Sequence, residues 1–249
     1  MVALGSEAQL ADAAAAGGAE KRRYVRRIFS EIAPRYDFLN HLLSANIDRA
    51  WRRRAIRELA WERHPNGTYL DLCAGTLDVA VELSRQPGFA GTVVGADFAE
   101  PMLRAGSGKA SRQTVAPVAA DALQLPLADG TLQGAVVAFG IRNVADLDAG
   151  LAETYRVLAP GARFVILEFS RPQSPIVRAF YHTYFNHVLP VIGGLVSGQH
   201  SAYRYLPRSV AHFPAESQLA RRMESAGFDR VRWYTLTYGI AAVHVGERP

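Results

Sequence analysis

One stretch decides the fold of this 249-residue chain: Tyr69-Leu70-Asp71-Leu72-Cys73-Ala74-Gly75-Thr76-Leu77-Asp78. Its apolar first half predicts a buried strand, Gly75 marks a tight turn, and the residues from Leu77 onward predict a helix. A second apolar run, residues 91–96, ends in Asp97. A strand, turn and helix followed by a carboxylate at the tip of the next strand are typical of an open α/β sheet that holds an adenosine by its ribose hydroxyls.

The alternation of strand-like and helix-like segments continues to the end of the chain. We expect strands at 68–73, 91–97, 115–120, 134–139 and 163–169, helices at 77–85, 100–109, 147–158 and 215–226, and a final hairpin from 231–236 and 239–245. This order predicts an α/β fold, a doubly wound and mostly parallel sheet of the Rossmann-like type. We divide the rest into a disordered tail (1–20), an N-terminal helical lid (21–67) and the main domain (68–249), with an apolar helical insertion at 172–206 after the fifth strand.

The composition bounds the class of protein. With 49% hydrophobic and 20% charged residues, the chain can bury a core and does not resemble a disordered protein. One cysteine excludes an internal disulfide framework and indicates a reducing compartment, and we interpret Cys73 as a buried filler rather than a reactive thiol. No secretory signal is evident, and the apolar stretch 176–198 is interrupted by charged and polar residues, so we expect a cytoplasmic protein without a membrane span.

The basic residues explain the net charge of +5 and cluster early, at Lys21, Arg22, Arg23, Arg26 and Arg27. They are interpreted either as a solvated helix face or as a surface attracted to anionic lipid headgroups. The excess is too small for a dedicated nucleic-acid binder, and we expect no nucleic-acid partner.

Four loops bring suggestive residues to one edge of the predicted sheet. Ligands of such sheets bind at the carboxyl ends of the strands, and there the chain places Gly75, Asp97, Asp121 and the run 139–143. Asp97 suits a ribose, Asp121 can accept from an adenine amino group, and the glycine turn suits a small charged tail such as methionine. The absence of a phosphate-cradling lysine loop argues against a nucleoside triphosphate.

These loops, taken together, resemble those of the class I S-adenosylmethionine-dependent methyltransferases. More narrowly, the chain resembles the ubiquinone/menaquinone biosynthesis C-methyltransferase family over roughly residues 25 to 246. The resemblance rests on Tyr36-Asp37-Phe38-Leu39-Asn40 with Ser44 and Trp51, on Phe139-Gly140-Ile141-Arg142-Asn143-Val144, on Arg156 to Gly161 continuing to Leu167-Glu168-Phe169-Ser170, on Tyr203-Arg204-Tyr205-Leu206 and on Ala226-Gly227-Phe228.

The resemblance implies S-adenosyl-L-methionine as the cofactor and methylation of a ring carbon of a polyprenylated hydroquinone, without a metal. It implies that demethylmenaquinol is converted to menaquinol; the alternative substrate is the 2-polyprenyl-6-methoxy-1,4-benzoquinol of ubiquinone synthesis. The implied cofactor-binding residues are Gly75, Thr76, Asp97, Asp121 and Ala122.

Three residues are the candidates for catalysis: Arg142, Asn143 and Tyr36. Arg142 follows the fourth strand and could stabilise a developing phenolate; its alternative role is a structural ion pair with Asp146 or Glu153. Tyr36 could order a water or a base, or could simply pack on the helical lid. The sequence does not identify the general base.

Two departures from the family pattern stand out. Leu77 occupies the place of the second glycine of the first loop, where a Cβ would strain a turn with positive φ. We expect ordinary helical dihedrals there, which would make leucine harmless. Asp48 replaces the histidine of the N-terminal signature, which makes a functional role of that side chain doubtful.

The polyprenyl tail of the implied substrate requires an apolar channel at the inner face of the membrane. We expect the insertion to line it; alternatively, its apolar residues simply cover the sheet or form a dimer interface. The candidate lining residues are Phe180, Tyr181, Tyr184, Phe185, Val188, Leu189, Val191, Ile192 and Leu195. We also expect the protein to bind the membrane peripherally, as a homodimer or within a quinone-synthesis complex. Two competing hypotheses are a non-catalytic fold relative that scaffolds quinone synthesis and an NAD-linked oxidoreductase. The second ranks last because the turn has one glycine of the three-glycine fingerprint.

Overall fold

The computed structural model describes residues 18–37, 44, 46–109, 111, 113–184, 187, 191 and 200–249. Its centre is a seven-stranded sheet in the order β3-β2-β1-β4-β5-β7-β6. The strands are β1 (Thr68–Leu72), β2 (Thr92–Asp97), β3 (Val115–Ala119), β4 (Leu132–Ala138), β5 (Leu158–Phe169), β6 (Asp229–Leu236) and β7 (Ala241–Glu247). The first five are parallel, and β7 pairs antiparallel with both β5 and β6. The predicted doubly wound sheet and its closing hairpin are therefore confirmed.

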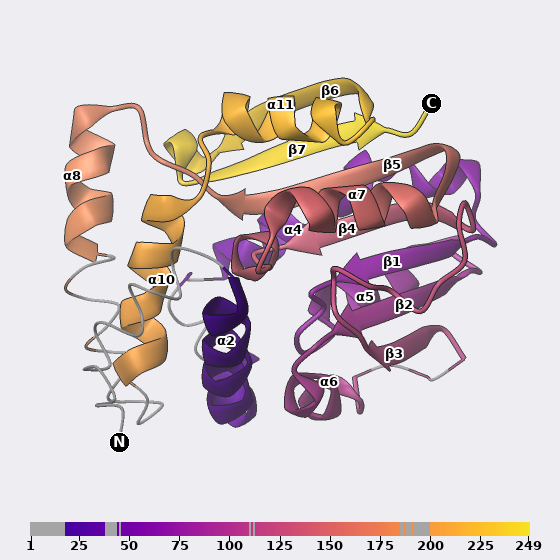
Figure 1. Cartoon of the computed structure of the whole chain (residues 1–249), viewed down its shortest axis with the longest axis horizontal. Coiled ribbons are helices and arrows are strands. Elements are labelled where there is room, and N and C mark those ends of the chain that lie inside the picture. The colour runs from indigo at the N-terminus through magenta and orange to yellow at the C-terminus, as the bar shows by residue number, and fades with distance from the viewer. Residues whose placement is uncertain are drawn as a thin grey trace.

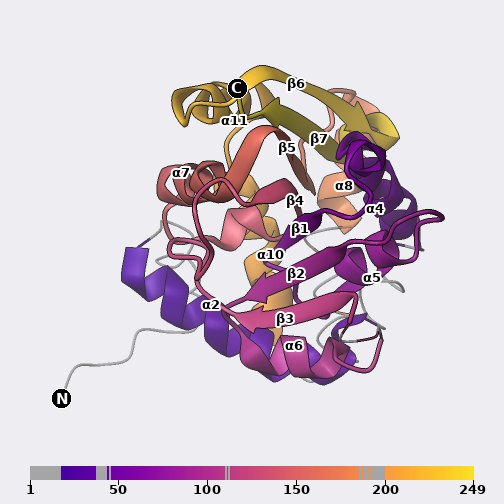
Figure 2. The same cartoon turned by 90° about the vertical axis from the view of Figure 1, so that its right-hand side faces the viewer.

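Helices cover both faces of the sheet (Figure 2). On one face α4 (Ile47–Glu58) and α5 (Asp78–Ser84) pack on alternate strand residues, and on the other face α7 (Leu147–Val157) and α11 (Glu216–Ser225) do so. The helix α6 (Glu100–Gly106) follows β2, and η2 (Trp61–Arg63) precedes β1. β1 is a central strand, with β2 and β4 at its edges and helices over both of its faces, which explains its nearly continuous apolar sequence.

Three helices lie beyond the carboxyl ends of the parallel strands (Figure 1): α2 (Gly18–Ile32), α8 (Pro175–Thr183) and α10 (His200–His212). The predicted disordered tail (1–20) ends three residues too late, because α2 already begins at Gly18, and residues 1–17 lie outside the described part of the chain. On α2 the apolar residues recur at helical spacing, and Val25 and Ile28 are buried against Tyr181 and Tyr205 of the insertion. The N-terminal helix and the insertion are thus packed together at the ligand-binding edge.

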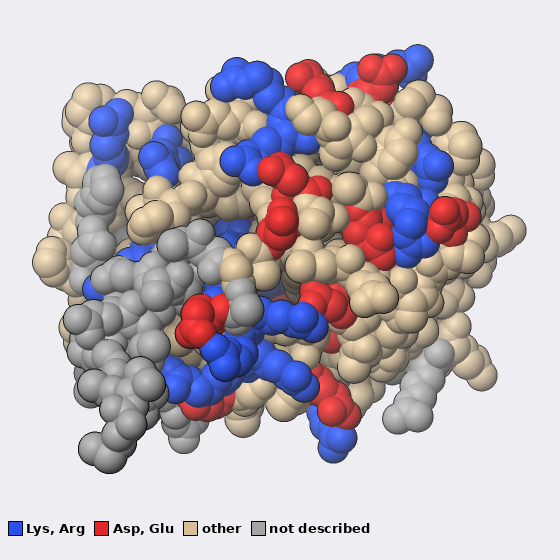
Figure 3. Space-filling view, in the orientation of Figure 1, with Lys and Arg blue, Asp and Glu red and all other residues tan. Residues whose placement is uncertain are grey.

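The opposite face of α2 carries the basic cluster. Arg22, Arg23, Arg26 and Arg27 are all exposed, and Figure 3 shows Lys and Arg side chains gathering over α2. Arg23, Arg26 and Arg27 form a charged helix face that is free of the core, whereas Arg22 forms an ion pair with Asp121 at the carboxyl edge of the sheet.

Most of the residues expected to line an apolar channel lie outside the described part of the chain: the Phe180 side chain, Phe185, Val188, Leu189, Ile192 and Leu195. Of the remaining three, Tyr181 is buried, Tyr184 is partly buried, and Val191 is exposed. The channel itself stays a prediction.

The expectation of ordinary helical dihedrals at Leu77 is wrong. Leu77 has φ 67° and ψ 19°, in the left-handed region, immediately before α5. The leucine is nevertheless accommodated, because its side chain is 2% exposed and covers the bare backbone of Gly95 on β2. A Cβ at Gly95 would lie 2.4 Å from Leu77 Cδ2, so the two residues are complementary. Burial of the leucine offsets the cost of its strained backbone, about 1–2 kcal/mol.

A buried carboxylate replaces the missing side-chain cap of α5. Leu77 cannot cap the helix, and Asp71 of β1 instead accepts a hydrogen bond from the backbone N–H of Ala80 (2.9 Å). Burial raises the pKa of the Asp71 carboxyl to about 7. The strand that leads into the first loop therefore also holds the helix that leaves it.

Candidate active site

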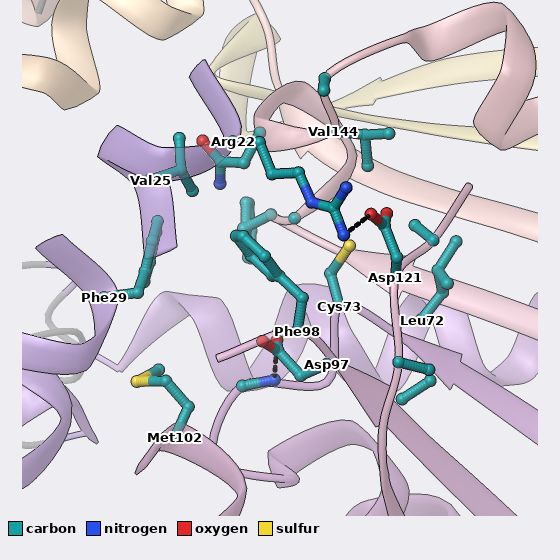
Figure 4. A pocket seen from close by; sticks show the side chains of 18 of the residues that line it. Arg22, Val25, Phe29, Leu72, Cys73, Asp97, Phe98, Met102, Asp121 and Val144 are labelled. Atoms are coloured by element: carbon teal, nitrogen blue, oxygen red, sulfur yellow. Dashed lines mark hydrogen bonds and ion pairs between the residues drawn. The ribbon is translucent and has the colours of Figure 1, made fainter. Parts of the chain in front are cut away.

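A cavity of about 60 Å³ opens at the carboxyl edge of the parallel strands, under α2 (Figure 4). The loops that follow β1, β2, β3 and β4 supply its floor and walls, and α2 supplies its cover. Its lining includes Gly75, Asp97, Asp121, Ala122, Asn143 and Tyr36, six of the eight residues predicted to form the site. The structure thus brings together residues that are spread over more than a hundred positions of the chain.

Asp97 links the loop after β1 to the loop after β2. One oxygen of its buried carboxylate accepts from the backbone N–H of Gly75 (2.9 Å), and the other accepts from the N–H of Ala99 (2.8 Å). Burial raises the pKa of Asp97, and these backbone N–H groups oppose the rise. Each carboxylate oxygen has further lone pairs, so Asp97 can still accept hydrogen bonds from a ligand in the cavity.

Gly75 lets a ligand approach the backbone. Its φ is 53°, and a Cβ there would lie 3.4 Å from Met102 Cε and 3.9 Å from Tyr36 Cε1. A side chain would therefore be strained and would also narrow the cavity between α6 and the N-terminal segment.

Asp121 and Ala122 follow β3, as predicted, but Asp121 already has a cationic partner. Its Oδ1 accepts from the backbone N–H of Leu123 (3.0 Å), and its Oδ2 lies 2.7 Å from Arg22 Nη2 of α2. Figure 4 shows the Arg22 side chain reaching from α2 across the cavity to this carboxylate, close to Cys73. This contact was not predicted, although both the basic cluster and Asp121 stand out in the sequence.

Cys73 lines the same cavity. Burial raises the pKa of its thiol, and the carboxylates around it raise the pKa further. The thiol therefore stays protonated at neutral pH, which supports the interpretation of Cys73 as a filler.

Arg142 is not among the residues that line this cavity. Its buried guanidinium lies 2.7 Å from Glu168 Oε1 at the end of β5, and it also donates to the Phe139 carbonyl and to Ser209 Oγ (3.3 Å). Burial raises the pKa of the Glu168 carboxyl, and the adjacent Arg142 opposes the rise. The pair fixes the short helix η3 (Ile141–Asn143), which carries Asn143, to the end of β5.

The ion-pair partners considered for Arg142 were wrong. Asp146 caps α7 by accepting from the N–H of Ala149 (3.1 Å), and Glu153 pairs with Arg156 (2.7 Å). The signal for the true partner was present in the run 167–170, whose acidic residue, Glu168, ends a strand next to β4.

Asn143 points to a ligand more directly than Arg142 does. It is 8% exposed and lines the cavity, and its Oδ1 has no hydrogen-bond partner in the described structure. An unsatisfied buried carbonyl costs about 1–3 kcal/mol. This oxygen is suited to accept a hydrogen bond from a bound molecule.

Tyr36 and Thr76 are placed differently from each other. Tyr36 lines the cavity and packs edge-on against Phe29 of α2, with ring centroids 5.9 Å apart. Thr76 is buried outside the lining, and its hydroxyl donates to the Asp37 carboxylate. The Thr76 side chain therefore holds the N-terminal segment onto the first loop.

A chain of ion pairs continues from this contact. Lys109 Nζ lies 2.5 Å from both Asp37 and Asp78, and Arg52 of α4 lies 3.0 Å from Asp78. Asp48, the departure noted in the N-terminal signature, pairs with Arg52 at 2.7 Å. The network ties α4 and the segment after α2 to the start of α5, and Asp48 has a structural place in it.

The described residues contain no group of three or more His, Cys, Asp or Glu side chains that could hold a metal ion. None of the helices in that part of the chain combines the length and hydropathy that a bilayer crossing requires.

The comparisons with known proteins agree with this geometry. The model of the ubiE/COQ5 methyltransferase family matches residues 17–248. The demethylmenaquinone methyltransferase of Thermus thermophilus is 52% identical over 225 residues, which cover 89% of this chain and 100% of that protein. The ubiquinone/menaquinone biosynthesis C-methyltransferase UbiE of Geobacter sulfurreducens is 46% identical over 92% of this chain and 90% of its own.

Among solved structures, a SAM-dependent methyltransferase from Thermotoga maritima superposes with a TM-score of 0.57 at 17% sequence identity, covering 88% of this chain and all of that one. This likeness supports the fold. The family model and the curated relatives match nearly the whole chain, and both indicate the same family of methyltransferases. The chain belongs to the ubiE/COQ5 methyltransferase family.

Proposed function

We propose that this protein transfers a methyl group from S-adenosyl-L-methionine to a ring carbon of demethylmenaquinol, giving menaquinol, and that the cavity under α2 holds the cofactor. The proposal is supported by relatives named demethylmenaquinone methyltransferase, at 52% and 45% identity. The main support for the site is that Gly75, Asp97, Asp121 and Asn143 line one cavity at the carboxyl edge of the sheet.

The residues around the cavity suit this cofactor. Asp97 would accept both ribose hydroxyls, Gly75 would let the methionine part pass close to the backbone, and Asp121 with Ala122 would receive the adenine. When bound, the cofactor supplies an electrophilic methyl group, so the acceptor carbon needs activation rather than the donor. Thr76 would act indirectly, by holding Asp37 against the first loop.

On the acceptor side, we assign the central role to Asn143. Its free Oδ1 would accept from a hydroquinone hydroxyl, and its amide N–H₂ would donate to the oxygen that becomes a phenolate. Arg142 would act indirectly, because its ion pair with Glu168 fixes η3, which carries Asn143. Tyr36 would close the cavity from the N-terminal side.

α2 would serve as a lid that approaches the membrane. Its four exposed arginines (Arg22, Arg23, Arg26 and Arg27) could each add about 1 kcal/mol of attraction to an anionic surface. The polyprenyl tail of the substrate resides in the bilayer, so a peripheral position at the inner face of the membrane would let the quinol ring reach the site. A homodimer or a larger quinone-synthesis complex would be compatible with this position.

A competition assay tests the substrate assignment. Purified protein with S-adenosylmethionine is offered demethylmenaquinol and 2-polyprenyl-6-methoxy-1,4-benzoquinol with equal tails, and the products are separated by mass spectrometry. Faster methylation of demethylmenaquinol is the expected result. Exclusive methylation of the benzoquinol would assign the chain to ubiquinone synthesis, and binding of cofactor without methylation of either would favour a scaffolding role.

A further inference from the structure

A second, larger cavity adjoins the first at Val144 and Ala145. Its volume is about 210 Å³, and residues from α2, η3, the start of α7, α10 and α11 surround it. We call it the basic cavity; its lining consists of Lys21, Ile141, Arg142, Val144, Ala145, Leu147, Tyr205, Ser209, His212, Phe213, Pro214 and Arg222. The function proposed above leaves this space without a role.

The charge of the lining is one-sided. Four of its side chains are basic (Lys21, Arg142, His212 and Arg222), and none of the described residues that line it is acidic. Two of the four have acidic partners outside the lining, since Arg142 is held by Glu168 and Arg222 by an exposed aspartate of α7. Lys21 and His212 have no acidic partner among the described residues.

Lys21 is the least compensated of these groups. It is partly buried on α2 and makes no hydrogen bond or ion pair with a described residue. Burial, together with the nearby charge of Arg142, lowers the pKa of Lys21 to about 8, while Glu168 opposes the decrease. An anion bound beside the Lys21 ammonium would favour its charged form and raise its pKa back toward the usual value.

Two more features of the wall favour an anion. Tyr205 is 2% exposed, and its hydroxyl has no hydrogen-bond partner in the described structure. His212 uses Nδ1 on the Arg208 carbonyl, which leaves Nε2 for another contact.

We propose that the basic cavity binds a phosphoryl anion, either free phosphate or diphosphate or the phosphate of an anionic lipid headgroup. A group with several acceptor oxygens matches donors that converge from three helices, through Lys21 of α2, His212 of α10 and Arg222 of α11. The hydroquinone is neutral and gains little there. Bound phosphate would hold α2 against α10, and thereby hold the cover over the adjoining cofactor cavity.

Calorimetric titration with inorganic phosphate and with diphosphate, in a phosphate-free buffer, tests the proposal on the full chain. The variants are Lys21→Gln and His212→Gln, and the matched control is Arg23→Gln, which removes an equal charge from the same helix but lies 77% exposed outside the cavity. We expect saturable binding that weakens roughly tenfold in Lys21→Gln, weakens also in His212→Gln, and is unchanged in Arg23→Gln. Melting temperatures establish that each variant is folded.

Flotation with vesicles distinguishes the two sources of phosphate. Vesicles of phosphatidylcholine alone are compared with vesicles that contain phosphatidic acid, for the same four proteins. Binding to phosphatidic acid that depends on Lys21 and not on Arg23 identifies a headgroup site, whereas titratable binding of free phosphate with no such vesicle effect identifies a soluble ligand. Equal weakening in all variants, or no saturable binding in either experiment, would overturn the proposal. The affinity for S-adenosylmethionine is also measured for Lys21→Gln, so that a failure of the phosphate proposal can be distinguished from a failure of the methyltransferase assignment.

Discussion

Arg22 competes with the adenine for Asp121 if the proposed cofactor site is correct. In the structure Arg22 Nη2 lies 2.7 Å from Asp121 Oδ2, with side-chain exposures of 57% and 21%. An ion pair this exposed is worth about 0.2–1 kcal/mol. Arg22→Gln removes that competitor, and it also removes a positive charge from the path of a cofactor with net positive charge. We therefore expect S-adenosylmethionine to bind about 1.4-fold to about fivefold more tightly to the variant.

Isothermal titration at low and at moderate salt measures this difference. The advantage of Arg22→Gln should shrink as salt screens the ion pair of the wild type. Arg23→Gln, one position further along α2 and outside the cavity, serves as the control and should bind as the wild type does. Weaker binding by Arg22→Gln would refute the reasoning, because it would show that Arg22 contacts the cofactor instead of obstructing it.

Four further variants test other parts of the account. Asp97→Ala should weaken cofactor binding by roughly 1.5–3 kcal/mol in calorimetry, and unchanged affinity would mean that the ribose lies elsewhere. Asn143→Ala should lower kcat by about 10²-fold with little change in cofactor affinity, whereas normal steady-state turnover would exclude it from the acceptor site. Leu77→Gly loses about 2–5 kcal/mol of packing and relieves about 1–2 kcal/mol of strain, so chemical denaturation should show a net loss of up to about 4 kcal/mol, and a gain in stability would contradict the pairing with Gly95. The Asp71 carboxyl has a pKa of about 7 in the folded protein and about 3.9 in the unfolded chain, so its contribution to stability falls by about 4 kcal/mol in all as pH rises through that window. Asp71→Asn should therefore raise Tm at pH 8 and leave it unchanged near pH 4. Equal shifts of Tm at both pH values would contradict this.

The sheet and the main binding loops could be predicted from sequence because their signals are local. Buried parallel strands appear in the sequence as short apolar runs, and their carboxyl ends necessarily lie at the same edge of the sheet. That rule alone places Gly75, Asp97, Asp121 and Asn143 at one edge of the sheet. The antiparallel hairpin at the C-terminus was equally local.

The contacts that were missed are those between distant elements. Leu77 could not be assigned its left-handed backbone from its own neighbours, because the space that accommodates it is provided by Gly95 on another strand. Arg142 was paired in prediction with acids close by on the chain, whereas strand pairing brings Glu168, 26 residues away, against it. The reach of Arg22 to Asp121 likewise depends on where α2 crosses the edge of the sheet, which no periodicity encodes.

The transfer of a labelled methyl group tests the central claim most directly. Purified protein is incubated with S-adenosylmethionine labelled in its methyl group and with demethylmenaquinol in mixed micelles, and the lipid product is analysed by mass spectrometry and for the position of the label. The account predicts label on the ring carbon of menaquinol with the wild type, and a large loss of labelling with Asn143→Ala under saturating cofactor. A folded wild-type protein that binds the cofactor in calorimetry but leaves the quinol unlabelled would contradict it.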